Sequence, residues 1–179
     1  MLNPDQAKWD KRYQDRDAEP RAASVLKENL HLLPKAGKAL DLACGLGGNA
    51  LLLAEQGLDV EAWDISPVAI DKLNQKAAGL TIHGKVIDIT AESLAADSFD
   101  VIVISYFLDR DIVPAIIHAL KPGGLLFYQT FNQNLLGRGP GNPGYRLQEN
   151  ELLRLFAPLV VRFYREEEGS DEAILIAQK

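Results

Sequence analysis

Residues 39–54 read ALDLACGLGGNALLLA and combine three signals in one short segment. A short apolar run typical of a buried strand is followed by a glycine turn, and the apolar residues after the turn have helical spacing. Gly45, Gly47 and Gly48 carry no side chains, so the backbone turns tightly there and a ligand can approach it. The N–H groups at the start of the following helix point at such a ligand. The segment therefore predicts a strand–turn–helix site for a nucleotide-type ligand.

The glycine pattern alone leaves the identity of the nucleotide open. Gly45-x-Gly47-x-x-Ala50 satisfies the G-x-G-x-x-G/A fingerprint of dinucleotide sites, and Asp64 lies about 20 residues further on, where that fingerprint places an acid. Asp41, however, lies at the end of the predicted strand, where burial of a carboxylate is costly unless it binds something. It suits a ligand with a cationic group, such as the ammonium of a methionine moiety. Both kinds of ligand stay open at this point.

Length and composition narrow the class of protein. A chain of 179 residues predicts one domain that buries about 70% of its unfolded surface. The net charge of −6 argues against a nucleic acid as the main partner, because an acidic surface repels it. No apolar run approaches the length of a membrane span and the N-terminus lacks a signal-peptide core, so no membrane partner is expected. Cys44 is the single cysteine, which excludes an intrachain disulfide and favours a cytoplasmic location.

Strands and helices alternate along the chain from residue 38 onward. The pattern predicts strands at 38–43, 58–63, 85–89, 99–105, 125–131, 160–166 and 173–177, and helices at 48–56, 66–79, 111–120 and 148–156, with a weak helix or loop at 91–97 and a turn at 121–124. Before them, a helix over 3–13 capped by Asn3, a polar linker at 14–19 and a second helix from Pro20 to Leu33 are expected. This alternation predicts an α/β fold with a doubly wound parallel sheet, and the last two strands are compatible with a hairpin.

Acidic residues stand at the carboxyl ends of three successive predicted strands. Asp41, Asp64 and Asp88 lie at these positions, and ligands of open parallel sheets bind at the carboxyl ends of the strands. The two oxygens of Asp64 suit both hydroxyls of a ribose. Asp88 suits an exocyclic amine of adenine, with Ile89 packed on the ring. Each acid alone is equally compatible with a turn or a helix cap, but three acids at successive strand ends favour a ligand site.

Five motifs together carry a family resemblance. They are LDLACGLG at 40–47, VEAWDIS at 60–66, Asp88-Ile89, FDVI at 99–102 and LKPGGL at 120–125. In this order and spacing, residues 37–131 resemble class I S-adenosylmethionine-dependent methyltransferases. The resemblance implies a Rossmann-like, seven-stranded, mostly parallel sheet with helices on both faces and a C-terminal antiparallel hairpin. It also implies a single methyltransferase domain over 1–179, in which 1–33 form a helical cap over the cofactor and 34–179 form the core.

The resemblance also implies a cofactor, S-adenosylmethionine, with S-adenosylhomocysteine as product. Asp41 and the glycine turn are expected to hold the methionine end, Asp64 the ribose and Asp88 the adenine. The full set of residues expected at the cofactor is Trp9, Tyr13, Asp41, Ala43, Gly45, Gly47, Asn49, Asp64, Ile65, Asp88, Ile89 and Ser105.

One branch of the class resembles this chain most. The segments GNALLLAEQG at 48–57 and DISP at 64–67 look like the tellurite-resistance-type and thiopurine-type branch. WDKRY at 9–13 is similar to the W-x-x-x-W/Y element with which that branch covers its cofactor, although Tyr13 stands where some members have tryptophan. Aromatic faces near the sulfonium are favourable for a cation. The alternative is that Trp9 and Tyr13 are ordinary core residues.

Acceptor recognition is expected in two segments. One follows the fourth strand, and the other is the long glycine-rich loop at 132–147, since loops of this length in a compact domain are usually functional or disordered. The candidates are Tyr106, Phe107, Arg110, Arg138, Tyr145 and Arg146, with Asn132, Asn134 and Asn142 in or beside the loop. Tyr106, Phe107 and Arg110 are equally compatible with a purely structural role in packing. The histidines are scattered without metal-ligand spacing, so no metal site is expected.

The expected activity is methyl transfer to a small-molecule acceptor, with soft thiol, selenium and tellurium compounds as candidates. Such a reaction needs mainly alignment of acceptor and methyl at about 3–3.5 Å and exclusion of water, so no catalytic dyad is required. The segment SYFL at 105–108 differs from the N-P-P-Y-like element of enzymes that methylate DNA amino groups. Two alternatives remain: a non-catalytic module that binds the cofactor or a protein partner, and a nicotinamide-dependent oxidoreductase.

Overall fold

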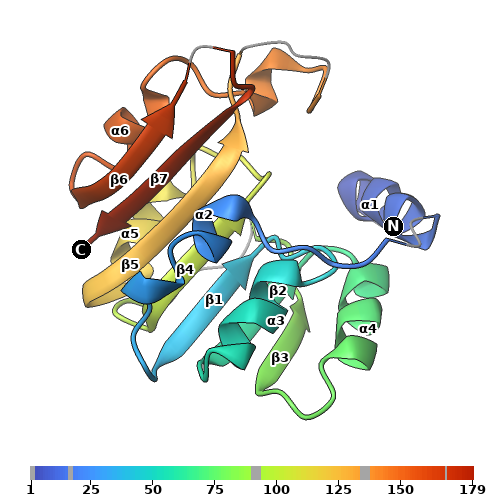
Figure 1. Ribbon diagram of the computed structural model, residues 1–179. Coiled ribbons are helices and arrows are strands. Elements are labelled where there is room, and N and C mark those ends of the chain that lie inside the picture. Colours follow the sequence, from blue (N-terminus) through green and yellow to red (C-terminus); the bar gives the residue numbers. More distant parts are fainter. Residues whose placement is uncertain (1–2, 16–17, 90–93, 134–137, 168) are drawn as a thin grey trace.

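The computed structural model describes residues 3–15, 18–89, 94–133, 138–167 and 169–179 and contains one sheet of seven strands (Figure 1). The strand order is β3-β2-β1-β4-β5-β7-β6, in which β1 to β5 pair in parallel and β7 is antiparallel to both β5 and β6. This confirms the predicted Rossmann-like sheet and its C-terminal antiparallel pair. The strands are β1 (Lys38–Leu42), β2 (Asp59–Asp64), β3 (Ile82–Val86), β4 (Phe99–Ser105), β5 (Leu120–Phe131), β6 (Val160–Glu166) and β7 (Glu172–Gln178).

Helices cover both faces of the sheet, as predicted. Figure 1 shows α2, α3 and α4 in front of the sheet and α5 and α6 behind it, while α1 stands beside the upper end of α4. In the part of the chain that the structure describes, no helix is long and apolar enough to cross a membrane. The helices are α1 (Pro4–Gln14), α2 (Ser24–Lys27), α3 (Gly48–Glu55), α4 (Pro67–Lys76), α5 (Val113–Ala119) and α6 (Glu151–Leu155), with 3₁₀ turns at Leu30–Leu32 and Pro143–Tyr145.

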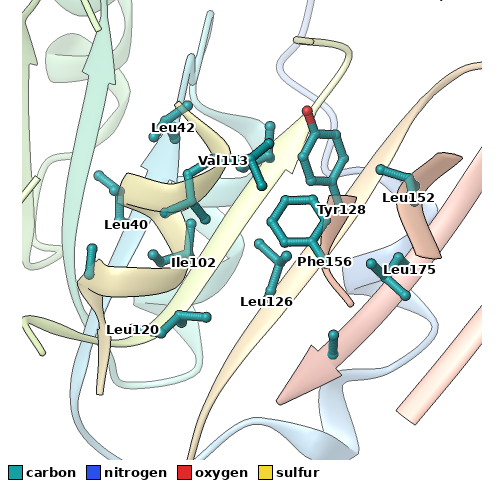
Figure 2. Packing of buried hydrophobic residues seen from close by; sticks show 14 of the residues in the cluster. Leu40, Leu42, Ile102, Val113, Leu120, Leu126, Tyr128, Leu152, Phe156 and Leu175 are labelled. Carbon is teal, nitrogen blue, oxygen red and sulfur yellow. The ribbon is translucent and has the colours of Figure 1, made fainter. Parts of the chain in front are cut away.

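Two apolar cores lie on opposite faces of the sheet because neighbouring side chains of a strand point to opposite sides. From β1, Leu40 and Leu42 enter the core under α5 and α6, whereas Ala39 enters the core under α2, α3 and α4. In the first core the rings of Tyr128 and Phe156 pack with centroids 5.6 Å apart (Figure 2). These cores leave the carboxyl ends of the parallel strands as one common edge.

The N-terminal segment only partly follows the prediction. Asn3 caps α1 as expected, since its side chain accepts a hydrogen bond from the Asp5 N–H. The continuous helix predicted from Pro20 to Leu33 is wrong: the segment contains only the short α2 and a 3₁₀ turn. Tertiary hydrogen bonds override the helical pattern, because the Ala23 N–H donates to a side chain of α3 and the Val25 N–H donates to a side chain of β5.

The third strand lies earlier than predicted, at 82–86 in place of 85–89. Gly84 occupies its centre, because a Cβ there would come within 2.8 Å of the Asn74 side chain and 3.0 Å of Ile70 on α4. A glycine inside an otherwise weak strand pattern conceals the strand in the sequence. Asp88 consequently follows the strand end by two residues and still lies at the expected edge.

Further element boundaries differ from the prediction. The helix predicted at 66–79 ends at Lys76. Asp111 does not cap the helix after β4, which begins at Val113 without a side-chain cap. The helix predicted from Gln148 begins at Glu151. The turn at 121–124 forms the beginning of β5, where the pairing with β4 is irregular. The weak helix or loop at 91–97 lies partly outside the described residues.

Candidate functional site

The three predicted carboxylates lie along one edge of the sheet. Asp41 is in β1, Asp64 ends β2, and Asp88 follows the end of β3, and these three strands are direct neighbours in the sheet. The Asp88 carboxylate accepts a hydrogen bond from Asn3 Nδ2 at 2.7 Å, which connects it to the beginning of α1. The edge where ligands of parallel sheets bind therefore carries three acids in strand order.

Asp41 is fully buried at the centre of this edge. Its carboxylate accepts hydrogen bonds from the Ala50 N–H at 2.9 Å and from Asn49 Nδ2 at 3.4 Å. Asn49 Nδ2 also donates to Ser105 Oγ at 2.9 Å, so β1, α3 and the end of β4 meet at one amide. Burial raises the pKa of Asp41 to about 7, the two hydrogen bonds oppose this, and the charge of Asp64 adds to it. A cationic ligand group would stabilise the charged form of Asp41 directly.

Asp64 is held by backbone groups on both oxygens. The Gly45 N–H donates to Oδ2 at 2.8 Å, and the Ser66 N–H donates to Oδ1 at 2.9 Å. Burial raises the pKa of Asp64, while these hydrogen bonds lower it. A carboxylate has about four acceptor positions, so the backbone hydrogen bonds from Gly45, Ser66 and Ile65 leave capacity for a ligand donor.

The glycine turn is shaped by close packing as well as by its backbone angles. Ala43, Gly45 and Gly47 have φ values of 56°, 53° and 80°, in the left-handed region. For Ala43 this conformation costs about 1–3 kcal/mol, and such strain clusters at ligand sites. A Cβ on Gly47 would overlap the side chain of Leu73 on α4. The turn thus fits tightly against α4, and the N–H groups of Gly45 and Gly47 bind Asp64 Oδ2 and the Cys44 carbonyl.

Helix α1 lies against the loops that follow β1 and β2. The rings of Trp9 and Tyr13 stack with centroids 5.7 Å apart and an angle of 23° between their planes. The Tyr13 hydroxyl is so close to Gly45 that a Cβ there would lie 2.8 Å from it. Ser66 Oγ donates to Asp10 Oδ1 at 2.5 Å. The aromatic pair predicted as a cofactor cover is therefore next to the glycine turn and the loop after Asp64.

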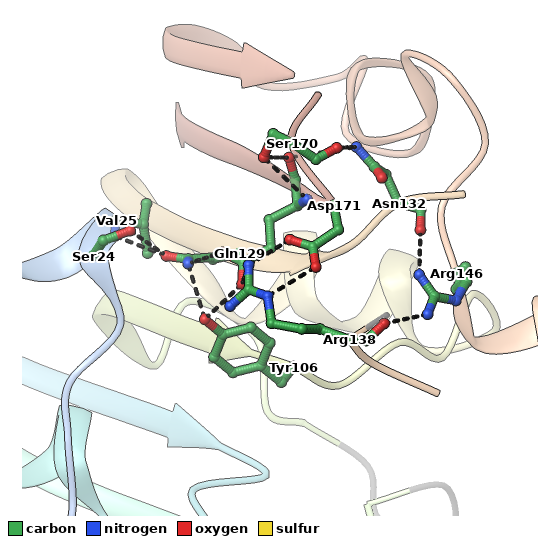
Figure 3. Close-up of polar contacts among 10 residues, drawn as sticks. Ser24, Val25, Tyr106, Gln129, Asn132, Arg138, Arg146, Ser170 and Asp171 are labelled. Atoms are coloured by element: carbon green, nitrogen blue, oxygen red, sulfur yellow. Dashed lines mark hydrogen bonds and ion pairs between the residues drawn. The ribbon is translucent and has the colours of Figure 1, made fainter. Parts of the chain in front are cut away.

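Tyr106 stands directly after β4 in a strained conformation, with φ at 56°. Its hydroxyl donates to Glu172 Oε1 and accepts from Gln129 Nε2, both at 3.1 Å (Figure 3 shows the bond to Gln129). Its ring lies 5.1 Å from that of Phe131 at the end of β5. Burial and the neighbouring Glu172 raise the pKa of Tyr106 to about 12, so its hydroxyl stays protonated.

Glu172 is a candidate site residue that the sequence analysis missed. It begins β7, pairs with Phe131 in the sheet and accepts a hydrogen bond from Gln129 Nε2 at 2.5 Å. Because β7 runs antiparallel to β5, its first residue lies at the same edge as the last residues of the parallel strands. The available signal was an acid immediately before the apolar run AILIA, combined with the expected hairpin.

Two predicted acceptor residues hold the segment 138–147 in place. Arg146 is buried and donates to the carbonyls of Asn132 at 2.9 Å, Pro140 at 2.8 Å and Arg138 (Figure 3 shows the first and last of these). Arg110 binds Glu151 with two nitrogens at 2.6 and 3.0 Å, and it also donates to carbonyls in the same segment. Both guanidinium groups thus bind the protein itself.

The other acceptor candidates are spread over the same end of the molecule. Arg138 donates to both oxygens of buried Asp171, at 2.9 and 2.5 Å, beside Tyr106 (Figure 3). Phe107 packs against the core, and its carbonyl accepts from a buried tyrosine. Tyr145 is 52% exposed. Of the loop residues, Asn142 caps the 3₁₀ turn and Asn134 lies outside the described residues. Of the residues expected at the cofactor, Ile89 is buried and Ile65 is half-buried.

A groove of about 560 Å³ opens elsewhere, between α3 and the segment before α2. Both aliphatic and charged side chains line it, among them Leu51, Leu52, Leu80, Glu19, Lys27, Glu55 and Lys76. None of the three edge carboxylates lines it, so the chemistry-bearing residues and this groove are separate features.

Comparison with known families gives one match that covers most of the chain. Residues 6–129 match the family of the tellurite resistance protein TehB. Among individual proteins, the ubiquinone biosynthesis O-methyltransferase of Azotobacter vinelandii is 33% identical over 141 residues, covering 69% of this chain and 59% of that protein. The protein of the same name from Pseudomonas fluorescens is 30% identical over 128 residues, covering 66% of this chain and 53% of that one. The chain thus spans between about half and three-fifths of the length of these two relatives.

Similar solved structures share the fold. TehB from Haemophilus influenzae has a TM-score of 0.73 at 24% identity, covering 97% of this chain and 66% of that one. An S-adenosylmethionine-dependent methyltransferase from Methanosarcina mazei has a TM-score of 0.70 at 23% identity, covering 89% of this chain and 98% of that one. Geranyl diphosphate C-methyltransferase from Streptomyces coelicolor, solved with S-adenosylhomocysteine, has a TM-score of 0.74 at 14% identity, covering 99% of both chains.

Proposed function

The chain belongs to the TehB family, and from that membership we propose that it transfers the methyl group of S-adenosylmethionine to a small-molecule acceptor. The observation that carries the proposal is the row of carboxylates at the edge of the sheet. Asp41, Asp64 and Asp88 lie on neighbouring strands beside a glycine turn. A dinucleotide does not call for the buried carboxylate at the first position, whereas a ligand with a cationic amino-acid end does.

Each group of residues has a distinct role in this proposal. Asp41, set by Asn49, binds the ammonium of the methionine end, and Asp64 accepts both ribose hydroxyls. Asp88 and Ile89 receive the adenine. Trp9 and Tyr13 cover the site from α1 and exclude water from it. When bound, the cofactor supplies an activated methyl group on a sulfonium, so the protein contributes mainly alignment and desolvation.

The acceptor side of the proposal rests on Tyr106 and its surroundings. Tyr106 keeps a left-handed conformation next to Ser105, which is connected through Asn49 to Asp41. Strain of this kind is retained where it positions a functional side chain. Family membership favours a soft thiol, selenium or tellurium acceptor, and the O-methyltransferase relatives favour a hydroxyl group. A cytoplasmic reaction remains part of the proposal.

Formation of S-adenosylhomocysteine tests the proposal. The protein is incubated with S-adenosylmethionine and with thiol, phenol, selenite and tellurite acceptors in separate reactions, and the product is measured by mass spectrometry. We expect S-adenosylhomocysteine to form with at least one of these acceptors, and we expect none to form in a reaction without an acceptor. Binding of the cofactor without turnover of any acceptor would contradict the proposal and favour a non-catalytic module that binds the cofactor.

A further inference from the structure

We propose that Glu172 is the general base of the methyl transfer and that the acceptor is an uncharged hydroxyl or thiol compound, not an oxyanion. This inference rests on the proposed function and narrows its substrate class. It follows from the location of Glu172, from its hydrogen bonds and from the charges around it.

The location of Glu172 connects it to the cofactor side of the site. Ser105 accepts from Asn49, the same amide that contacts Asp41, and Ser105 is the sheet partner of Gln129 in β5. Gln129 in turn donates to Glu172 at 2.5 Å. One continuous row of polar groups therefore runs along the strand edge from the carboxylate at the methionine end to Glu172.

The hydrogen bonds of Glu172 orient it without saturating it. Oε1 accepts from the Tyr106 hydroxyl and Oε2 from Gln129 Nε2. Oε1 also lies 3.5 Å from Arg138 Nη2, whereas Oε2 has Gln129 as its hydrogen-bond donor. Since a carboxylate oxygen accepts two hydrogen bonds, Oε2 keeps a position for an acceptor proton. The side chain is 14% exposed, so it is accessible from the edge. Tyr106 stays protonated and acts as a positioning donor, which leaves Glu172 as the proton acceptor of the pair.

The charges around Glu172 disfavour an anionic acceptor. Arg138 is bound to both oxygens of buried Asp171 and lies 3.5 Å from Glu172 Oε1. Two carboxylates thus share one guanidinium, and the side chains of Asp171, Glu172 and Arg138 together carry a net charge of −1. Arg110 and Arg146, the other arginines expected at the acceptor, bind Glu151 and backbone carbonyls. An oxyanion would meet a negative charge here, whereas an O–H or S–H donor meets a matching carboxylate.

The step balances as a proton transfer coupled to methyl transfer. The acceptor O–H or S–H bond breaks, and its proton passes to the Glu172 carboxylate. The freed electron pair of the acceptor forms a bond to the methyl carbon. The bond between that carbon and the sulfonium breaks, its electrons stay on sulfur, and S-adenosylhomocysteine leaves as a neutral thioether. The proton on Glu172 is then released to water.

The test compares Glu172→Gln with the wild type over a series of thiophenols of graded acidity and a phenol. A general base contributes about 10²–10⁴-fold, so kcat/KM of the variant should fall by that factor with the phenol and with the least acidic thiol. With a thiol that is already ionised at the assay pH the loss should be small. Glu55→Gln removes the same charge from an exposed position on α3 and should behave as wild type.

Three outcomes would overturn the inference. The first is an equal loss with every acceptor, which is the signature of a structural role. The second is no loss with any acceptor, and the third is faster wild-type turnover of selenite or tellurite than of thiols and phenols. If Glu172→Gln does not fold, Tyr106→Phe is used in its place. For this variant we expect kcat/KM to fall by about 10-fold, with the same dependence on the acidity of the acceptor. Failure of the wild type to bind S-adenosylhomocysteine would refute the proposed function itself, whereas normal binding and turnover with an unchanged variant would refute only the role of Glu172.

Discussion

Asp41→Asn is expected to stabilise the cofactor-free protein at pH 8 and to weaken S-adenosylmethionine binding at the same time. Asp41 is fully buried, and its pKa rises from an ordinary value of 3.8 to about 7. The folded state then binds a proton that the unfolded state has lost, so stability decreases as the pH rises from about 4 to 7 and stays low above 7. A shift of this size corresponds to about 4 kcal/mol as an upper bound. Because asparagine carries no charge, we expect a gain of about 2 kcal/mol at pH 8.

The loss of binding follows from the same charge. A hydrogen bond to an ionised group contributes about 1.5–3 kcal/mol, so removal of the carboxylate should reduce cofactor affinity by about 10²-fold. In the wild type, affinity should rise between pH 6 and 8, with release of a proton on binding. Urea unfolding at pH 5 and 8 and calorimetric titration in two buffers measure both effects. Asp71→Asn, at an exposed position on α4, is the control. A variant that is less stable at both pH values and binds as well as wild type would contradict this role of Asp41.

Asp64→Ala is expected to lose about 10²–10⁴-fold in cofactor affinity. Two hydrogen bonds from ribose hydroxyls to an ionised carboxylate contribute about 3–6 kcal/mol together. The same carboxylate accepts from the Gly45 and Ser66 N–H groups, so this variant should also unfold at lower temperature. Asp64→Asn keeps an acceptor for one backbone group and separates the two effects. Titration with S-adenosylhomocysteine measures the affinity, and an unchanged value in a folded variant would mean that Asp64 does not bind the ribose.

The sequence predicts the row of carboxylates at the edge of the sheet better than the surroundings of the acceptor candidates, for a physical reason. Asp41 and Asp64 stand near the carboxyl ends of their strands, next to glycine and N-cap signals, and all of these signals are local. The extended conformation at Ala23 and the start of α2 depend instead on the hydrogen bonds that the Ala23 and Val25 N–H groups donate to the side chains of Asn49 and Gln129. No local pattern records such contacts, so helical spacing gave a helix that does not form.

The acceptor side depends on contacts between distant segments. Arg110 and Arg146 look like ligand-binding residues in the sequence, but their partners are Glu151 and the carbonyls of the long loop. Glu172 lies at the carboxyl ends of the parallel strands only because β7 runs antiparallel to β5. Burial and charge pairing of these residues are properties of the folded chain, so the sequence does not show which protein groups Arg110 and Arg146 bind or that Glu172 lies near Tyr106.

The most direct test of the central claim, a site for S-adenosylmethionine at the edge of the sheet, is the melting temperature of the protein with different ligands. A ligand at 100 times its dissociation constant stabilises the folded state by about 2.7 kcal/mol, which is roughly 5–10 °C for a chain of this size. We predict this increase with S-adenosylmethionine and S-adenosylhomocysteine and no change with NAD⁺ or NADH. An increase with NAD⁺ or NADH and none with S-adenosylmethionine would contradict the account.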